Sequence, residues 1–262
     1  SMNLNVAIKG IKEVDNILDL EVPKQLRFKR ATGINYFDQA LGGFGFTPST
    51  SMMLTGGAGC GKTTMMLQVA DSCMAPAQGH IAMINTGEES LYQVRMTTER
   101  LGLKNGFIPG QSIMVEDVLT KACRIQKANP GKQLILFQDS IQTCNDGKYA
   151  DGGTTGSTPL RCVEMFTNWA KETFGIVVFI GQVNKDGKFS GKNAIKHAID
   201  VHGHIFFDDD KKSVTFGERL FEIPKNRFGA NGQTYILGIG KKGIYEKGSF
   251  QPQQDWSAKD DD

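Results

Sequence analysis

The feature of this sequence that most constrains its fold is a regular alternation of short apolar runs with amphipathic segments. The clearest runs are IAMIN at 81–85, QLILF at 133–137 and IVVFI at 176–180. Apolar runs of this length between expected helices indicate strands buried on both faces, which is typical of a parallel sheet covered by helices. The sequence therefore predicts an α/β fold with a doubly wound, mainly parallel sheet.

The expected elements continue this alternation along most of the chain. After about residue 200 the pattern changes to strand-like segments joined by short polar turns, which favours antiparallel strands added to the same sheet. We expect an N-terminal arm or helix at 3–31, one core domain at 32–248 and a flexible acidic tail at 249–262. Helices are predicted at 35–41, 62–74, 90–101, 116–128 and 160–174, and the strands before residue 200 at 51–55, 81–85, 113–115, 133–137 and 176–180.

A glycine-rich motif gives the first indication of chemistry. Residues 56–63 read GGAGCGKT, fit the pattern G-x-x-x-x-G-K-[ST], and lie between an expected buried strand and an expected helix. In such a loop the backbone amides surround phosphate oxygens, the lysine contacts the β- and γ-phosphates and the hydroxyl holds Mg²⁺. A glycine turn that binds nothing is the alternative. The motif predicts a site for ATP and Mg²⁺ built from Gly56, Gly57, Ala58, Gly59, Cys60, Gly61, Lys62, Thr63 and Thr64.

Acidic residues follow two other strands of the expected sheet. Asp139 comes after the run at 133–137, where its carboxylate is placed to hold the Mg²⁺ shell together with Thr63. Capping of the following turn is the alternative for Asp139. Glu88 lies in TGEES at 86–90, where a carboxylate can orient a water in line with the γ-phosphate. For Glu88 the alternative is N-terminal capping of the next helix.

Two long polar loops, at 142–159 and 184–193, follow the strands at 133–137 and 176–180. In a parallel sheet, loops at the carboxyl ends of strands line the ligand crevice, so both are expected on the same rim as the phosphate loop. The second loop combines cations with an aromatic ring, which suits contact with the phosphates and bases of single-stranded DNA. A solvated lysine-rich loop is the alternative. The DNA-binding candidates are Lys185, Lys188, Phe189 and Lys192.

Composition narrows the class of protein. The chain has 262 residues, 39% of them apolar and 22% charged, which excludes a disordered chain. Lys and Arg total 30 against 28 acidic residues, so any basic binding site must be local. The sequence contains no apolar run of about 18 residues and no secretion-signal profile at its start, so we expect a cytoplasmic protein without a membrane segment.

Cysteine and histidine usage offers little chemistry. The five cysteines are scattered without a C-x-x-C pair, which indicates reduced thiols. His202 and His204 stand two apart, so that alternation would place both on one face of a strand. A metal site at this pair is the less favoured interpretation.

Several further segments of the sequence are distinctive when they are taken together. They are TGINYFDQALGG at 32–43, the glycine-rich motif, TGEESLYQVRMTTERLG at 86–102, DSIQT at 139–143, GQVNKDG at 181–187 and KNRFG at 225–229. Together they resemble the RecA-type ATPase core of the RadA (Sms) family, over roughly residues 30 to 240. KNRFG is the most discriminating segment, because a phosphate loop alone indicates only a nucleoside triphosphate. A basic turn between two strands is the alternative for KNRFG.

The resemblance implies a DNA-dependent ATPase of homologous recombination and DNA repair, with translocase or helicase activity on single-stranded DNA. It implies a homo-oligomer, either a ring of six subunits or a filament, with a recombinase as partner. By matching motif, Lys62 contacts phosphate, Thr63 and Asp139 hold Mg²⁺, and Glu88 orients the attacking water. Gln182 would sense the γ-phosphate, and the loops at 142–159 and 184–193 would bind DNA. Lys225 and Arg227 would reach the nucleotide site of the next subunit.

The sequence also departs from this family. RadA-like proteins usually carry a four-cysteine zinc module and a Lon-protease-like domain, and this sequence shows neither, so we expect a bare motor core. A hexameric replicative DNA helicase motor is the first alternative. A nucleotide-switched assembly protein with no role on DNA is the second. The nucleobase contact stays open, with Arg95 and Arg100 as the candidates that the sequence offers.

Overall fold

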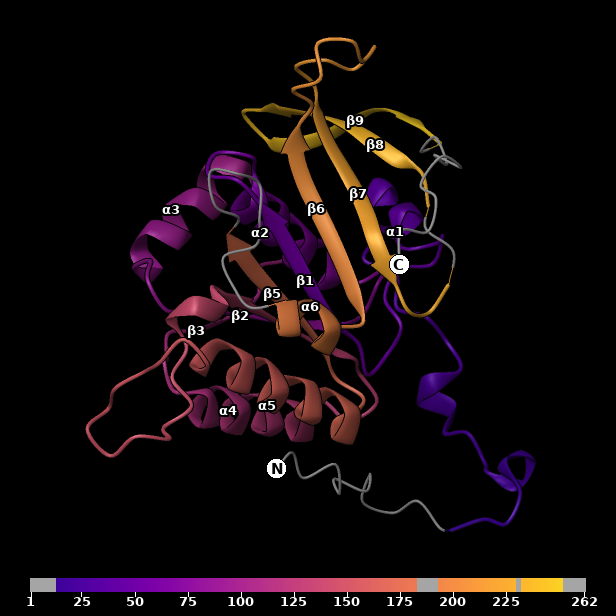
Figure 1. Cartoon of the computed structure of the whole chain (residues 1–262), viewed down its shortest axis with the longest axis vertical. Helices are drawn as coiled ribbons and strands as arrows, with labels where there is room; N and C mark the ends of the chain where they lie inside the picture. The colour runs from indigo at the N-terminus through magenta and orange to yellow at the C-terminus, as the bar shows by residue number, and fades with distance from the viewer. Residues whose placement is uncertain (1–12, 183–192, 230–231, 252–262) are drawn as a thin grey trace, which may run out of the picture.

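One mixed sheet organises the molecule (Figure 1). The computed structural model describes residues 13–182, 193–229 and 232–251. Nine strands follow the order β3-β2-β4-β5-β1-β6-β7-β8-β9, and the six from β3 to β6 run parallel. β7, β8 and β9 continue the sheet antiparallel, as the change of pattern after residue 200 predicts. The fold is thus the predicted doubly wound α/β sheet with antiparallel C-terminal strands.

The central strands form because their side chains are apolar on both faces. β1 (Ser51–Gly56) and β2 (Ile81–Thr86) are buried at every residue, as fully parallel strands between helices must be. The other strands are β3 (Ile108–Gly110), β4 (Leu134–Asp139), β5 (Ile176–Gln182), β6 (Val201–Phe207), β7 (Arg219–Asn226), β8 (Thr234–Gly240) and β9 (Gly243–Phe250).

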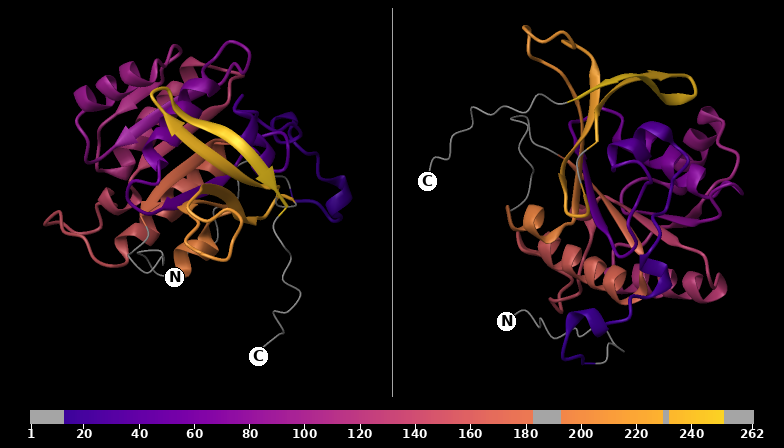
Figure 2. Two further views of the ribbon diagram at one scale, coloured as in Figure 1. Left: turned by 90° about the horizontal axis from the view of Figure 1, so that it is seen from above. Right: turned by 90° about the vertical axis from the view of Figure 1, so that its right-hand side faces the viewer.

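Helices cover both faces of the sheet, and each face has one cluster of buried apolar side chains. α1 (Asn35–Ala40), α2 (Lys62–Cys73) and α3 (Leu91–Leu101) pack over one cluster. α4 (Val115–Ala128), α5 (Thr158–Thr173) and α6 (Asn193–Ala198) pack over the other. Figures 1 and 2 show α4 and α5 side by side. In the parts of the chain that the structure describes, no helix is long and apolar enough to cross a membrane.

The described part of the N-terminal arm, residues 13–31, contains no α-helix. Val14, Ile17 and Leu18 have helical spacing, but residues 13–31 contain only two 3₁₀ turns, Ile17–Asp19 and Lys24–Leu26. Ile17 and Leu18 are both exposed, so the spacing has no apolar surface to pack against. An amphipathic pattern of this length does not form a helix without such packing.

Other differences concern short elements. The strand predicted at 113–115 is absent there, because Val115 already begins α4, and the edge strand is instead β3. β6 pairs with β1 in parallel, although its polar alternation suggested an antiparallel strand. β9 extends to Phe250, two residues into the predicted tail at 249–262.

Candidate phosphate-binding site

The glycine-rich motif forms the turn from β1 into α2. Gly59 and Gly61 have φ angles of 77° and 104°, which other residues adopt only with strain, and Gly61 is the N-cap of α2. A cavity of ≈ 350 Å³ lies at this turn. It is lined by Gly57, Ala58, Gly59, Gly61, Lys62, Thr63, Thr64, Asp139, Ile180 and Ile239. The predicted phosphate loop and the predicted Mg²⁺ residues thus share one cavity.

Cys60 belongs to the motif but does not line this cavity. Its side chain is buried in the apolar cluster beneath α2. Its carbonyl oxygen accepts a hydrogen bond of 2.8 Å from Nε of Arg219, the first residue of β7. The Arg219 guanidinium also lies 4.7 Å above the ring of Phe207, its cross-strand neighbour. Sequence reasoning missed Arg219, which fixes the phosphate loop from a strand that lies far away along the chain.

Lys62 lies folded back over the loop. Its Nζ donates to the carbonyl oxygens of Gly56 and Gly57, the second bond at 3.0 Å. Burial lowers the pKa of Lys62, and the nearby Cys60 and Asp139 partly offset that effect. An ammonium group held by backbone carbonyls beside a cavity is placed to exchange them for phosphate oxygens.

Asp139 ends β4, two strands away from the phosphate loop, at the same carboxyl edge of the sheet. Its pKa is raised from 3.8 to about 6, mainly because the carboxyl is buried, and further because Glu88 and Glu89 lie nearby. Lys62 acts in the opposite direction. A bound cation would favour the charged form of this carboxyl group, so Asp139 suits the role of a ligand of Mg²⁺.

Glu88 and Glu89 follow β2 and precede α3. The capping alternative for Glu88 does not hold, because the N-cap of α3 is Ser90, whose Oγ accepts from the amides of Tyr92 and Gln93. Glu88 is exposed, whereas Glu89 is half-buried. The Gly87 amide bonds the carbonyl oxygen of Asp139 at 3.0 Å, so this loop is tied to the end of β4.

A buried pair of amide side chains lies in the two strands, β2 and β4, that precede these carboxylates, and sequence reasoning did not predict the pairing. Gln138 is fully buried, and its Oε1 accepts from Nδ2 of Asn85 on the neighbouring strand at 2.9 Å. Asn85 also bonds both backbone groups of Ser112. A polar residue at the end of a buried strand was the available signal, because a buried amide requires a partner.

The loop at 142–159 is anchored at its base. The Asn145 backbone exchanges hydrogen bonds with Ile113 and Val115. Asp146 and Arg161 form an ion pair at 2.5 Å. Figure 1 shows the loop extending beyond α4, on the side away from β7.

Lys185, Lys188, Phe189 and Lys192 lie outside the described residues. Gln182 ends β5, where its backbone stands in register with Gly56, the first residue of the glycine motif.

Lys225 and Arg227 lie toward the other end of the sheet. Lys225 pairs with His202 and His202 with Met53, which places Lys225 three residues, or roughly 10 Å, before Gly56 along the strand direction. Its Nζ donates to the carbonyl oxygens of Lys196 and Ile199. β8 pairs with β7 only at its first three residues, Arg219 to Phe221, so Lys225 lies beyond that pairing, and Arg227 follows the end of β7.

Arg227 itself forms an ion pair with Asp200. The Nη1 to Oδ1 distance is 2.7 Å, with side-chain exposures of 49% for Arg227 and 4% for Asp200. Asp200 also accepts hydrogen bonds from the amide and the hydroxyl of Ser51 at the start of β1. Geometry therefore separates both cations from the phosphate loop of their own chain.

The histidine pair is a buried polar cluster. Thr55 Oγ1 lies 2.6 Å from Nε2 of His202 and 2.8 Å from Nδ1 of His204, so both rings occupy one face, as alternation predicts. Burial and the neighbouring His204 lower the pKa of His202 to about 4, so its ring is neutral at pH 7. Within the described residues, no group of three or more His, Cys, Asp or Glu side chains is arranged to hold a metal.

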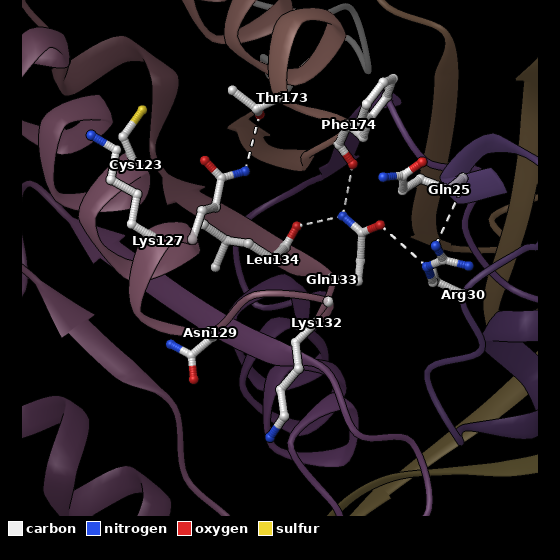
Figure 3. A pocket seen from close by; sticks show the side chains of 12 residues that line it. Gln25, Arg30, Cys123, Lys127, Asn129, Lys132, Gln133, Leu134, Thr173 and Phe174 are labelled. Atoms are coloured by element: carbon white, nitrogen blue, oxygen red, sulfur yellow. Dashed lines mark hydrogen bonds between the residues drawn. The ribbon is translucent and has the colours of Figure 1, made fainter. Parts of the chain in front are cut away.

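A second cavity, of ≈ 390 Å³, lies at the amino end of β4 (Figure 3). The Gln133 amide donates to the carbonyl oxygens of Leu134 and Phe174 and accepts from Nε of Arg30 at 3.3 Å. Arg30 in turn bonds the carbonyl oxygens of Gln25 and Phe28. These hydrogen bonds attach the N-terminal arm to the core beside the cavity, which lies at the opposite end of β4 from Asp139.

Comparison with known proteins finds similar ATPases and DNA repair proteins. Residues 30–148 match the family described as "ATPase: KaiC". The DNA repair protein RadA of Escherichia coli is 30% identical over 237 residues, which are 90% of this chain and 48% of that protein. RadA of Mycobacterium tuberculosis is 34% identical over 218 residues, which are 81% of this chain and 42% of that protein. The chain spans about half the length of these relatives.

A solved structure shows the same fold. A KaiC-like protein from the archaeon Pyrococcus horikoshii superimposes with a TM-score of 0.67 at 20% sequence identity, covering 84% of this chain and 99% of that one. The same family is indicated by the phosphate loop, by the order of the strands and by the similarity to RadA. The chain therefore has the RecA-type fold, and its sequence is similar to about half the length of the RadA proteins.

Proposed function

We propose that this core hydrolyses ATP and couples hydrolysis to movement on single-stranded DNA during recombination and repair, within a ring or filament of identical subunits. The observation that carries the proposal is the convergence of Lys62 and Asp139 on one cavity, with Glu88 and Glu89 close enough to raise the pKa of Asp139. A lysine, a metal-binding carboxylate and a water-orienting carboxylate are what phosphoryl transfer to water requires. The RadA relatives support the choice of DNA repair.

The protein groups would divide the work in the following way. The amides of the loop and the start of α2 bind the phosphates, and Lys62 turns from its carbonyl partners to the terminal phosphates. Glu88, exposed at the end of β2, accepts a hydrogen bond from water and orients it toward the γ-phosphate. Thr63 and Asp139 would hold Mg²⁺, which neutralises charge on the phosphates.

The end of β4 connects this site to the proposed DNA loop. Gly87 packs so closely on Thr143 that any Cβ added at Gly87 would overlap the threonine side chain. Thr143 also donates to the carbonyl oxygen of Ser140 at 2.8 Å, next to Asp139. DNA that binds the loop at 142–159 could therefore shift Thr143 and, through it, Gly87, the residue before Glu88. This contact supports DNA-dependent hydrolysis.

The cations at the other end of the sheet are assigned to the next subunit. Lys225, near the end of β7, and Arg227, just after it, lie too far from their own phosphate loop to serve it, so a role in hydrolysis requires a second copy. In a head-to-tail assembly, one end of a subunit faces the opposite end of its neighbour. Arg227 would then exchange Asp200 for the γ-phosphate of that neighbour.

The test is the rate of ATP hydrolysis with and without single-stranded DNA. We expect DNA to raise the rate severalfold and to leave the Lys62→Ala protein inactive. A slow rate that is indifferent to DNA would overturn the coupling and favour a nucleotide-switched assembly protein. Processive unwinding of a forked duplex without a recombinase would favour a replicative helicase motor.

A further inference from the structure

The connection between β6 and β7 forms a stiff ribbon that projects from the sheet. Residues 208–218 follow the carboxyl end of β6, and Figures 1 and 2 show them, in orange, projecting beyond the strands. The Asp208 amide donates to the carbonyl oxygen of Glu218 at 2.9 Å, and the Gly217 amide donates to that of Asp208 at 2.7 Å. Thr215 Oγ1 donates to Oδ2 of Asp208 at 2.6 Å. These bonds hold the ribbon in one shape where it leaves the sheet.

Apolar side chains of this ribbon are exposed, although its backbone is fixed. Val214 is fully exposed, and Phe216 and Phe207 keep 53% and 47% of their surface exposed. Apolar side chains that lie together and uncovered are typical of an interaction site. A rigid projection also loses little conformational entropy when a partner covers it. The ribbon therefore has the properties of a docking element.

The base of the ribbon is joined to the phosphate loop. Arg219, the residue that follows the ribbon, donates to the Cys60 carbonyl oxygen at 2.8 Å, and its guanidinium lies 4.7 Å from the ring of Phe207. Val214 is five residues before Arg219, so the tip lies at most about 18 Å from the Arg219 backbone. The ribbon is thus a fixed neighbour of the proposed nucleotide site.

A pocket adjoins the KNRFG turn, at the other end of β7. Its volume is ≈ 570 Å³, Leu41 and Phe44 are among the residues that line it, and Lys29 is its one charged side chain among the described residues. Phe44 keeps 72% of its surface exposed. Gly229 also lines the pocket, two residues after Arg227 and at most about 7 Å from it. A partly apolar pocket thus lies beside the cation that the proposed function assigns to a neighbouring subunit.

The ribbon and the pocket are too far apart to meet within one chain. β7 lies between them, and the seven residue steps from Arg219 to Asn226 span roughly 23 Å. In a head-to-tail assembly, however, the phosphate end of one copy faces the KNRFG end of the next. The ribbon of the first copy then faces the pocket of the second.

Charge favours a protein partner over DNA for this ribbon. Residues 208–210 are three aspartates, and Lys211 and Lys212 offset only part of their charge. An acidic projection is repelled by the phosphate backbone of DNA. Lys29 at the pocket is exposed and has the opposite charge, and Arg227 lies close to the pocket along the chain. Complementary charges favour the docking of the ribbon on the pocket.

We infer that the ribbon tip of one copy, with Val214 and Phe216, docks beside Phe44 in the pocket of the next copy. The contact joins a ribbon fixed to one phosphate loop with a pocket fixed to the neighbouring KNRFG turn, so it sets the position of Arg227 relative to the γ-phosphate. This inference rests on the head-to-tail assembly of the proposed function and adds the surface that aligns its two catalytic halves.

Cysteine cross-linking of the full chain with Mg·ATP tests the contact directly. A chain that carries both Val214→Cys and Phe44→Cys should give a ladder of covalent multimers with a short bismaleimide, because each tip meets the pocket of the next copy. Each single variant should cross-link no more than the parent, whose own cysteines are buried or half-buried. Met96→Cys with Phe44→Cys is the matched control, because Met96 is exposed on α3, outside the ribbon, and should give no ladder.

A second variant measures the effect of the contact on assembly and hydrolysis. Val214→Glu places a charge at the tip, so sedimentation velocity should show assembly weakened about tenfold or more. ATP hydrolysis should fall with assembly, whereas Mg·ATP affinity should stay within twofold of the parent, because Val214 does not line the phosphate cavity. Met96→Glu is the control and should change neither assembly nor hydrolysis.

The other outcomes would overturn the inference in different ways. A ladder from Val214→Cys alone would show that tip meets tip, which contradicts a contact between tip and pocket. A parent that assembles and hydrolyses ATP while the double cysteine variant gives no ladder would overturn the contact and leave the proposed function standing. A parent that stays monomeric at every concentration would contradict the assembly in the proposed function, and the contact with it.

Discussion

The two ends of the sheet hold their cations in different ways. At the carboxyl end, Lys62 is buried beside a cavity, with its pKa lowered and carboxylates close by. At the other end, Arg227 is half-exposed and forms an ion pair with Asp200. Under the proposed function, the first end would bind phosphate within a single chain, whereas the cation of the second end would act on the phosphate of a neighbouring copy. The chain would then contain both halves of a catalytic site at separate places.

The largest effect is expected from Arg227. A cation supplied to the γ-phosphate by a neighbour contributes roughly 10³ to 10⁵ in rate, so Arg227→Ala should lower ATP hydrolysis of the assembled protein by that factor. Steady-state phosphate release measures it. Lys247→Ala removes an exposed ion pair with Glu218 and should leave the rate within twofold. If both variants keep the parent rate, the KNRFG turn is only structural.

Glu88 should come next. Glu88→Gln removes the water-orienting carboxylate but no phosphate contact, so nucleotide affinity should persist while turnover falls about 10²-fold or more. Nucleotide binding and single-turnover hydrolysis, measured on one preparation, separate the two effects. Glu89→Gln is the matched variant. A Glu88→Gln protein that hydrolyses ATP within about threefold of the parent would transfer the role to Glu89.

Asp139 gives a prediction for stability. Its pKa is raised to about 6, so the folded chain holds this proton more tightly than the unfolded chain. The free energy of unfolding should therefore fall as pH rises from about 4 to about 6, by up to about 3 kcal/mol. Asp139→Asn removes the charge, so without nucleotide the variant should be roughly 1 to 3 kcal/mol more stable than the parent at pH 7.

Urea unfolding at pH 5 and pH 7 checks this prediction. Asp208 is the contrasting carboxyl, because hydrogen bonds from Ser213 and Thr215 lower its pKa. Asp208→Asn should therefore give no gain in stability at pH 7. An Asp139→Asn protein that is less stable than the parent at pH 7 would show that the folded chain stabilises the Asp139 carboxylate, which contradicts a raised pKa.

The smallest effect concerns salt. If Lys185, Lys188 and Lys192 each contact a phosphate, replacing all three with alanine should reduce the slope of log affinity against log salt by about two, from roughly 0.7 per contact. Fluorescence anisotropy with labelled single-stranded DNA measures the slope. An unchanged slope would move the DNA contact elsewhere, first to the basic residues of the N-terminal arm.

Much of the sheet could be predicted because its signals are local. The buried strands and the turn at 56–63 each depend on a few adjacent residues, and the structure has them within one or two positions. β3 could not be predicted, because it is three residues long and contains Pro109, which only an edge strand tolerates. β6 was expected to be antiparallel because the chain after residue 200 consists of strand-like segments joined by short polar turns, yet β6 pairs with β1 in parallel, and Thr55 contacts both histidine rings there.

The parts of the site that could not be predicted depend on register between distant strands. The Arg219 contact with Cys60, the packing of Gly87 on Thr143 and the fixing of Gly243 by Gln68 each join segments more than 50 residues apart. Neither residue of such a pair has a sequence pattern of its own. Lys62 and Asp139, by contrast, could be placed in one cavity because parallel strands carry their carboxyl ends to the same edge.

The two ends of the sheet should meet only between copies of the chain, and mixing two inactive proteins tests this directly. Lys62→Ala keeps an intact Arg227, and Arg227→Ala keeps an intact phosphate loop. When equal amounts assemble at random, about a quarter of the interfaces combine an intact phosphate loop with an intact Arg227 from the neighbouring subunit. ATP hydrolysis should therefore return to about a quarter of the parent rate. Mixtures that co-assemble by light scattering yet stay inactive at every ratio would contradict the claim.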